Sequence, residues 1–231
     1  MEGRRKVGLL IPSTDTAMEA DLWRHLPADV TLHVARMLME ATTVAAEEKM
    51  LTEELEPAAR RVGSVMPELV VFGCTSAAAL RGIEGDRVIS QTVTAITGAP
   101  CVTVVQAAVN DIRNRRMRSL LLVTPYVEEI NLRLQATFRQ AGLPVTGVVG
   151  MGLDHDLKIG AVPPTRIREF VIEAVKHAQT APDGVFVSCT TFRALEVAAQ
   201  LEQDLGMPVV TSNKAVLRAL GERLGIQLGL E

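Results

Sequence analysis

Aromatic residues are scarce in this chain of 231 residues: Phe, Trp and Tyr together make up 3% of it. That scarcity argues against the stacking surfaces with which proteins hold single-stranded nucleic acids. Positive charge is not in excess either, because 24 Lys and Arg face 27 Asp and Glu. A net charge of -3 offers little attraction to nucleic acid or to an anionic membrane. We therefore expect neither of them as a partner.

Cysteine is rare as well, with three residues at positions 74, 101 and 189. None of them has a second cysteine at the close spacing of a zinc site or a redox pair. An odd, widely spaced set is typical of free thiols in a reducing compartment. The sequence therefore predicts a protein with neither a bound metal nor a disulfide framework.

Long apolar runs are also missing from the chain. The run 7–11 ends at Pro12 and is shorter than the apolar core of a secretory signal. The longer stretch 93–109 is interrupted by Gly98 and Pro100, so it does not predict a transmembrane helix. We expect a cytoplasmic protein.

What the sequence does contain is a regular alternation of short apolar runs with amphipathic stretches. The apolar runs predict strands over 6–11, 30–37, 69–73, 102–105, 119–123, 145–149, 184–188 and 209–211. The stretches between them predict helices over 14–26, 47–65, 76–81, 91–97, 106–116, 127–141, 164–180, 192–206 and 214–224. Pro57 lies inside one helical pattern, so we expect a kink or two separate pieces there. The alternation indicates an α/β protein with parallel sheets.

The pattern occurs twice along the chain, which points to an internal duplication. Equivalent positions recur at a nearly constant offset: Pro12 and Pro125, Cys74 and Cys189, Pro100 and Pro208. We therefore predict two pseudo-symmetric halves, each a four-stranded parallel sheet flanked by helices. The predicted halves are 1–112 and 113–213, with the C-terminal helix, about 214–231, packing back on the first. Ligands of such sheets bind at the carboxyl ends of the strands, so we expect the active site in the cleft between the halves.

The two equivalent cysteines each follow a predicted strand and precede a predicted helix. A helix N-terminus lowers the pKa of a thiol and binds carboxylates. Two such loops across a cleft would hold a small carboxylate with one sulfur on each side. This arrangement suits addition of a thiolate to an activated alkene, or proton exchange at a carbon beside a carboxylate. Neither reaction needs a cofactor.

The alternative for any single cysteine is a role in the core, because free cysteine is among the most buried residue types. Cys101 has Val209 at the equivalent place in the second half, so we expect it to be a core residue. The repetition of Cys74 as Cys189 favours a functional role for that pair.

Four segments, taken together, resemble one known group of enzymes. They are Gly8-Leu-Leu-Ile-Pro-Ser-Thr-Asp15-Thr-Ala-Met-Glu, Phe72-Gly-Cys74-Thr-Ser, Thr124-Pro-Tyr126 and Val187-Ser-Cys189-Thr-Thr. The chain resembles, over nearly its whole length, the maleate cis-trans isomerase and arylmalonate decarboxylase group of the aspartate/glutamate/hydantoin racemase superfamily. The resemblance implies two α/β halves with the site between them, and oligomers are frequent in the group.

The resemblance also implies roles for particular residues. Cys74 is expected to attack a double-bond carbon and form a succinyl-type thioether, with Cys189 as the acid/base and Tyr126 bonded to a substrate carboxylate. The residues expected to bind the substrate are Ser13, Asp15, Thr75, Ser76, Tyr126, Asp156, Thr190 and Thr191.

Two acids depart from the pattern of the isomerases. Asp15 stands where they have an asparagine, and Asp156 falls at or near the place of a second asparagine. An amide donates hydrogen bonds to a carboxylate, whereas an ionised Asp only accepts them. Asp15 therefore either contacts the ligand, for instance through a substrate ammonium group, or caps the helix predicted over 14–26.

The favoured function is a cofactor-independent, two-cysteine cis-trans isomerase of the maleate type that acts on a small carboxylate. An amino-acid (Asp/Glu) or hydantoin racemase that uses two bases is the alternative, because such racemases keep both cysteines. Arylmalonate decarboxylases have glycine at the first position, so Cys74 argues against that activity. A non-catalytic protein that binds a small molecule is the remaining hypothesis.

Overall fold

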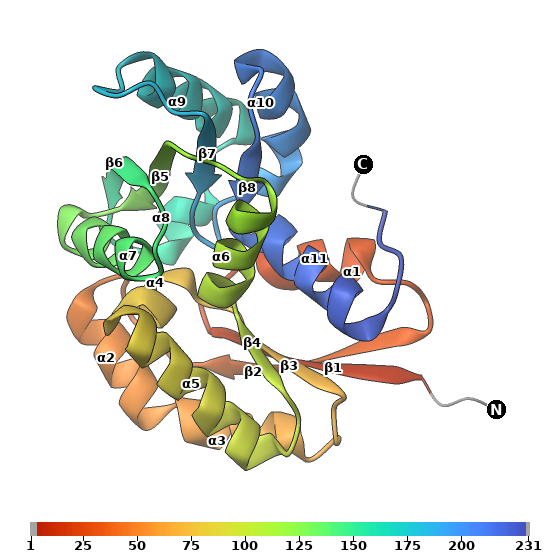
Figure 1. The fold of residues 1–231 in the computed structure, drawn as a ribbon. Coiled ribbons are helices and arrows are strands. Elements are labelled where there is room, and N and C mark those ends of the chain that lie inside the picture. The colour runs from red at the N-terminus through yellow and green to blue at the C-terminus, as the bar shows by residue number, and fades with distance from the viewer. Residues whose placement is uncertain (1–3, 230–231) are drawn as a thin grey trace.

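Eight strands form two separate parallel sheets in the computed structural model, which describes residues 4–229 (Figure 1). The strands of the first sheet are β1 (Arg5–Pro12), β2 (Val30–Met37), β3 (Leu69–Phe72) and β4 (Cys101–Thr103). Those of the second are β5 (Leu120–Tyr126), β6 (Val145–Leu153), β7 (Gly184–Val187) and β8 (Val209–Thr211). The strand orders are β2-β1-β3-β4 and β6-β5-β7-β8, so the two sheets repeat one topology.

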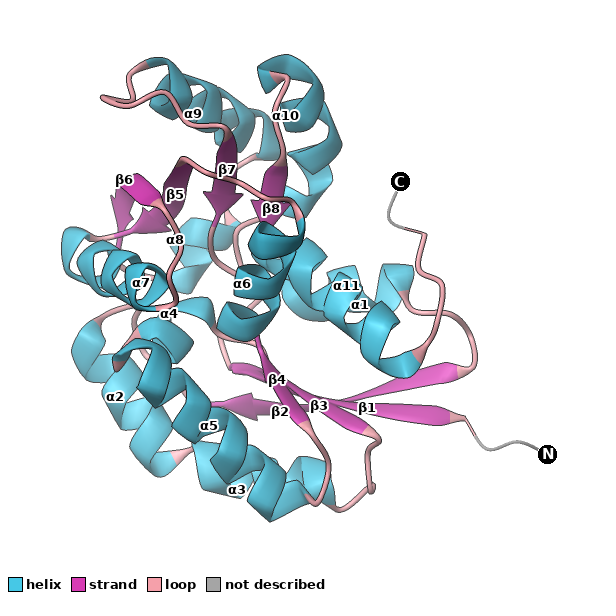
Figure 2. Cartoon of the chain, viewed as in Figure 1, coloured by secondary structure: helices cyan, strands magenta, loops and turns pink. Residues whose placement is uncertain are grey.

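Helices connect the strands and cover the sheets (Figure 2). In the first half of the chain they are α1 (Met18–His25), α2 (Val44–Glu53), α3 (Leu55–Gly63), α4 (Thr75–Ala79), α5 (Gly82–Thr97) and α6 (Val104–Asn114). In the second half they are α7 (Glu128–Gln140), α8 (Asp156–Gly160), α9 (Pro164–Lys176), the 3₁₀ helix Ala194–Val197, α10 (Ala198–Leu205) and α11 (Ser212–Leu224). The predicted α/β fold with two four-stranded parallel sheets flanked by helices is confirmed.

The central strands are apolar because helices bury both of their faces, as is usual for parallel sheets. All residues of β3 and β7 are buried. In the first sheet, α3 and α5 lie on one face and α1 and α11 on the other (Figure 2). In the second half, Phe138 of α7 stacks on Phe186 of β7 with ring centroids 5.1 Å apart. Both sheets therefore have a helix-covered core.

Several predicted boundaries of strands and helices were wrong, and a helix cap explains one of them. The strand expected over 102–105 ends at Thr103, because the hydroxyl of Thr103 accepts a hydrogen bond from the backbone N of Gln106 and starts α6. α5 is continuous from Gly82, whereas only its end was expected, and α8 was not expected. The helix expected over 192–206 begins as a 3₁₀ turn.

The interruption expected at Pro57 is confirmed. α2 ends at Glu53 and α3 begins at Leu55, which makes Pro57 the third residue of the second helix. The N–H groups of a helix's first turn have no partner within the helix, so a proline there sacrifices no hydrogen bond. The long amphipathic pattern therefore folds as two helices with a break before the proline.

The C-terminal helix α11 returns toward the first half of the chain, where it packs against α6 and α1 (Figure 1). The division into halves at 112/113 and 213/214 remains a prediction, and its terminal segments 1–3 and 230–231 lie outside the described residues. Assembly as a homo-oligomer and a cytoplasmic location also remain predictions. Across residues 4–229, no helix has the length and apolarity needed to cross a membrane.

One buried acid of the fold has consequences for stability. Asp86 on α5 is buried, and neither of its carboxylate oxygens has a hydrogen-bond partner of good geometry. Burial raises the pKa of Asp86 from 3.8 to about 6, against the smaller effects of Thr103 and Gln106. The folded protein therefore retains a proton that the unfolded chain releases, so stability falls as the pH rises from about 4 to about 6.

We predict that Asp86→Asn increases the free energy of unfolding at neutral pH by up to about 3 kcal/mol, with the gain disappearing below about pH 4. Urea unfolding at a series of pH values measures the difference. Glu84→Gln on the same helix is the matched control, since Glu84 is exposed and pairs with Arg87. A gain from Asp86→Asn that does not depend on pH would contradict the explanation.

Candidate active site

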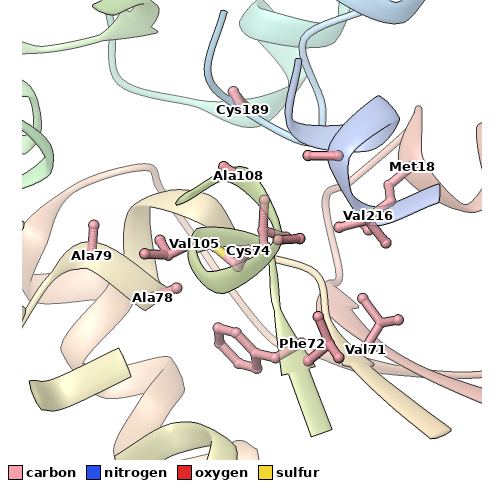
Figure 3. Close-up of a cluster of buried hydrophobic side chains, with 14 of the residues drawn as sticks. Met18, Val71, Phe72, Cys74, Ala78, Ala79, Val105, Ala108, Cys189 and Val216 are labelled. Carbon is pink, nitrogen blue, oxygen red and sulfur yellow. The ribbon is translucent and has the colours of Figure 1, made fainter. Parts of the chain in front are cut away.

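The two equivalent cysteines lie where the carboxyl ends of the two sheets meet. Cys74 follows Gly73 at the end of β3, and Cys189 follows Ser188 at the end of β7. Both belong to one cluster of buried side chains, which Figure 3 shows in close-up. Their exposed fractions are 4% and 5%. The site is thus a closed junction in this structure, and a substrate needs a local opening to reach the sulfurs.

Three hydrogen bonds join the two cysteine loops. The hydroxyl of Ser212 lies 3.0 Å from that of Thr75 and accepts a bond of 3.0 Å from the backbone N of Cys189. The hydroxyl of Thr190 donates to the carbonyl of Gly73 at 3.3 Å. The loops are therefore held in register across the junction by side chains from both halves.

Gly73 allows the chain to approach closely just before Cys74. A Cβ atom at this position would lie 2.6 Å from Sδ of Met18 and 2.7 Å from Cγ2 of Ile11, well inside van der Waals contact. The absence of a side chain thus lets α1 and β1 pack against the loop that carries the cysteine.

Asp15 bonds the start of α1 from two residues before Ala17, the N-cap of that helix, which is close to the capping role expected for it. Its Oδ1 accepts hydrogen bonds of 2.9 Å from the backbone N atoms of Ala17 and Met18 at the start of α1. Its Oδ2 accepts a bond of 3.0 Å from the hydroxyl of Thr191 in the other half. Asp15 therefore connects the start of α1 to the loop that carries Cys189. Its contact with a ligand remains a prediction.

Asp156 lies at the same junction, although it comes from the second half. Its two oxygens accept hydrogen bonds of 2.9 Å from the hydroxyls of Thr14 and Thr42. Burial is the main cause of its raised pKa, and the nearby charge of Asp15 adds to it. Ser13 lies at the edge of this group, where its hydroxyl accepts a bond of 3.1 Å from the backbone N of Met39.

Tyr126, the last residue of β5, lies close to both sulfurs. It is buried, and burial is the main reason why its pKa is well above the usual value. Negative charge on Cys189 or on Cys74 raises the pKa further, while the hydroxyl of Ser188 lowers it. A phenol in this place can donate a hydrogen bond to a group held between the two cysteines.

The expectation that helix N-termini lower the thiol pKa values was wrong. Burial raises the pKa of Cys74 well above its usual range, and the charge of Glu47 raises it further. Burial, followed by the charge of Asp156, likewise raises the pKa of Cys189. Both thiols are therefore protonated at neutral pH.

Local structure explains why the expected effect is weak. Cys74 is the N-cap of α4, but α4 has only five residues, so few peptide dipoles are aligned behind it. Cys189 is not at a helix N-terminus, since the next helical turn begins at Ala194 and is 3₁₀. Desolvation of the thiolate therefore outweighs the backbone N–H groups at both positions.

The backbone of Cys189 is in an unusual conformation, with φ of 98°. Residues other than glycine rarely adopt this region, and holding one there costs on the order of 1–3 kcal/mol. The hydrogen bond from its N to Ser212 stabilises the conformation. Such strain is concentrated at functional sites, which supports a functional role for this cysteine.

Besides Ser13, Asp15 and Asp156, three more of the residues expected to bind substrate already bond protein groups. The hydroxyls of Thr75, Thr190 and Thr191 are the ones engaged across the junction. The hydroxyl of Ser76 lies 3.7 Å from Sγ of Cys74. The structure thus brings the expected residues together, and whether each of them contacts a substrate remains a prediction.

Three residues of the junction were missed in the sequence: Glu47, Ser212 and Asn213. Ser212 follows β8 directly, at the same kind of strand end as the cysteines, and this position was a usable signal. The side-chain amide of Asn213 donates to the carbonyl of Thr190 at 2.9 Å and to Asp21 at 2.8 Å. Glu47 had no such signal, because it belongs to an amphipathic helix rich in charge.

Fold and site together define a class: a duplicated parallel α/β protein with a cysteine after the third strand of each half. A family model described as arylmalonate decarboxylase matches residues 7–228. The chain belongs to this family, as its resemblance predicted.

Curated relatives are enzymes with two different names. Over 209 residues the chain is 25% identical to an arylmalonate decarboxylase of Bordetella bronchiseptica, which covers 90% of this chain and 86% of the relative. It is 23% identical over 237 residues to a maleate isomerase of Geobacillus stearothermophilus, covering 96% of this chain and 92% of the relative. The chain therefore belongs among the isomerases and lyases of this group.

Solved structures agree on the fold. A maleate cis-trans isomerase mutant of Nocardia farcinica with a covalently bound succinylcysteine intermediate has a TM-score of 0.88 at 19% identity, over 98% of this chain and 96% of that one. A double mutant of arylmalonate decarboxylase in its liganded form also has a TM-score of 0.88, at 23% identity, over 96% and 93% of the two chains.

The role of Asp15 as a link between the halves leads to a stability prediction. Asp15→Ala leaves two N–H groups of α1 and the hydroxyl of Thr191 without their partner, so we expect a loss of about 2–4 kcal/mol in the free energy of unfolding. Asp15→Asn keeps one oxygen for the cap and should lose less. Urea unfolding with a double-mutant cycle to Thr191→Val measures the coupling, and a coupling of zero would contradict the link.

Proposed function

We propose that this protein is a cofactor-independent, two-cysteine isomerase that acts on a small carboxylate, with cis-trans isomerisation of the maleate type. One observation carries the proposal: the duplication brings two thiols from equivalent strand ends to one buried junction, with Tyr126 beside both. The succinylcysteine in the structurally similar maleate isomerase is consistent with a cysteine that adds to an alkene.

In the proposed reaction, Cys74 is the nucleophile. Its thiolate forms a bond from Sγ to one alkene carbon, and the π electrons move to the neighbouring carbon and its carboxylate. The former double bond is then a single bond and can rotate. Cys189 donates a proton to the neighbouring carbon and later takes it back. Breaking the C–S bond re-forms the alkene in its trans geometry and returns the thiolate.

The environment of the sulfurs suits these unequal roles. Cys189 has a strongly raised pKa, so it holds a proton that it can donate. Tyr126 is protonated for the same reason and can donate a hydrogen bond to a substrate carboxylate. Exclusion of water from the junction strengthens each of these interactions.

A specific observation favours the alternative, an amino-acid (Asp/Glu) or hydantoin racemase. Asp15 and Asp156 are both buried at the junction, and negative charge on them makes it costly to bind a dianion nearby. A substrate with fewer negative charges, or with an ammonium group, meets less repulsion. Both thiols would then act as the bases on opposite faces of one carbon.

The test is a proton NMR assay in deuterated water with maleate, aspartate, glutamate, hydantoins and an arylmalonate as substrates. Isomerisation of maleate without loss of carbon dioxide supports the proposal, exchange at the α-carbon of an amino acid or hydantoin supports the racemase, and decarboxylation supports neither. A protein that binds these compounds without turnover contradicts both.

We predict that Cys74→Ser and Cys189→Ser each reduce turnover by about a thousandfold or more, because each removes a reacting group. With maleate, Cys189→Ser should accumulate a covalent adduct on Cys74, which intact-protein mass spectrometry detects. Cys101→Ala is the matched control, since Cys101 lies in β4, and its activity should stay within a few-fold of the wild type. Adduct formation in Cys74→Ser would contradict the assignment of the nucleophile.

A further inference from the structure

Glu47 is a buried acid that the reaction described above leaves without a role. It lies in the first turn of α2, and its exposed fraction is 0%. Neither of its carboxylate oxygens has a hydrogen-bond partner of good geometry among residues 4–229. A buried carboxyl group without partners is costly, so its retention calls for an explanation.

The neighbours of Glu47 place it beside the nucleophile. α2 packs against α4, the helix that Cys74 caps (Figure 1). The hydroxyl of Ser76 is close enough to the Glu47 carboxyl to favour its ionised form. The same hydroxyl lies 3.7 Å from Sγ of Cys74. The hydroxyl of Ser76 is therefore a neighbour of both the thiol of Cys74 and the carboxyl group of Glu47.

The charges that face Glu47 come from two further helices and its own. Burial and the charges of Asp156 on α8 and Glu48 on α2 raise its pKa, whereas Ser76 and Arg133 on α7 lower it. The resulting pKa is about 8. Glu47 in turn raises the pKa of Cys74. A base whose pKa lies near the working pH is effective in proton transfer.

We propose that Glu47 is the proton acceptor for Cys74, acting through the hydroxyl of Ser76. The inference rests on the proposed function for the role of Cys74 as a nucleophile. The relay provides the deprotonation of Cys74, which the raised pKa of this thiol otherwise makes unfavourable.

The transfer balances without any other reactant. The S–H bond of Cys74 breaks, and its proton passes to Oγ of Ser76. The hydroxyl proton of Ser76 passes to a carboxylate oxygen of Glu47. The result is a thiolate at Cys74 and a neutral carboxyl group at Glu47. The negative charge has moved from the acid to the sulfur, and no second charge has been created. After elimination of the product, the reverse transfer restores the thiol.

The test uses the protein without substrate. Iodoacetamide alkylates thiolates, and peptide mass spectrometry gives the rate at Cys74 separately from the rates at Cys101 and Cys189 over a range of pH. With the relay, the rate at Cys74 rises through a transition near pH 8, where Glu47 loses its proton. Glu47→Gln should abolish this transition and slow alkylation at neutral pH by at least about tenfold.

The opposite result would overturn the relay. If Glu47 is only a negative charge near the thiol, its removal lowers the pKa of Cys74, and alkylation becomes faster in Glu47→Gln. The two explanations therefore predict changes of opposite sign. The matched control is Glu48→Gln on the same helix, whose carboxylate pairs with Arg81 at the surface. Because the charge of Glu48 raises the pKa of Glu47, this variant should keep the transition and move it slightly to lower pH, without the tenfold loss of rate.

Ser76→Ala provides a second test, which also decides the matter if Glu47→Gln fails to fold. It removes the intermediate hydroxyl and keeps the acid, so the relay requires the same slow alkylation at neutral pH. An unchanged rate at Cys74 would exclude Ser76 as the intermediate and overturn the proposal. Because no substrate is present, a protein with the transition near pH 8 but no turnover of maleate rejects only the proposed function.

Discussion

Desolvation at the junction of the two sheets is the constraint on which the chemistry of this site depends. The sheets meet end to end, and the side chains between them are buried there: both thiols, a phenol and several carboxyl groups. Removal from water penalises the charged form of each group more than the backbone N–H groups and hydroxyls nearby favour it. Burial therefore keeps both thiols and the phenol protonated at neutral pH, and it shifts the pKa values of the buried carboxyl groups upward.

Hydrogen bonds between the two halves hold this junction together. Each sheet presents loops at the carboxyl ends of its strands, and the polar bonds between the sheets run from one set of loops to the other. Asp15 bonds Thr191, and Thr190 bonds Gly73, so each cysteine loop is held partly by the opposite half. A shift of one half relative to the other would break the bond between Asp15 and Thr191 and the alignment of the sulfurs together.

Much of the fold could be predicted because parallel strands buried on both faces leave a clear apolar run in the sequence. The paired cysteines could be predicted for a related reason, since they follow such runs directly. The pKa values could not, because they depend on how many neighbours exclude water, and that is a property of tertiary packing. Local sequence placed Cys74 at a helix start correctly but could not show that the helix has five residues.

Glu47 shows the same limit most clearly. Glu47 and Glu48 are adjacent in one amphipathic helix, and nothing local separates them. Packing of α2 on α4 buries the first, while the second pairs with Arg81 at the surface. Glu47, the candidate for proton transfer, is thus a residue whose environment only the folded structure defines.

The duplication also explains why the two sulfurs are not equivalent. Cys74 starts a short helix and has Ser76 and Glu47 near it, whereas Cys189 has a positive φ and no such acid from α2 beside it; Asp156 and Tyr126 lie near both sulfurs. An acid that can accept a proton, Glu47, lies near the first sulfur, and the phenol of Tyr126 is close to both. Duplication creates the pair, and the two sulfurs differ in their neighbours, as the proposed reaction requires of a nucleophile and an acid. In the proposed isomerisation one sulfur adds to the alkene and the other only moves a proton, so unequal surroundings of the two sulfurs are consistent with that reaction.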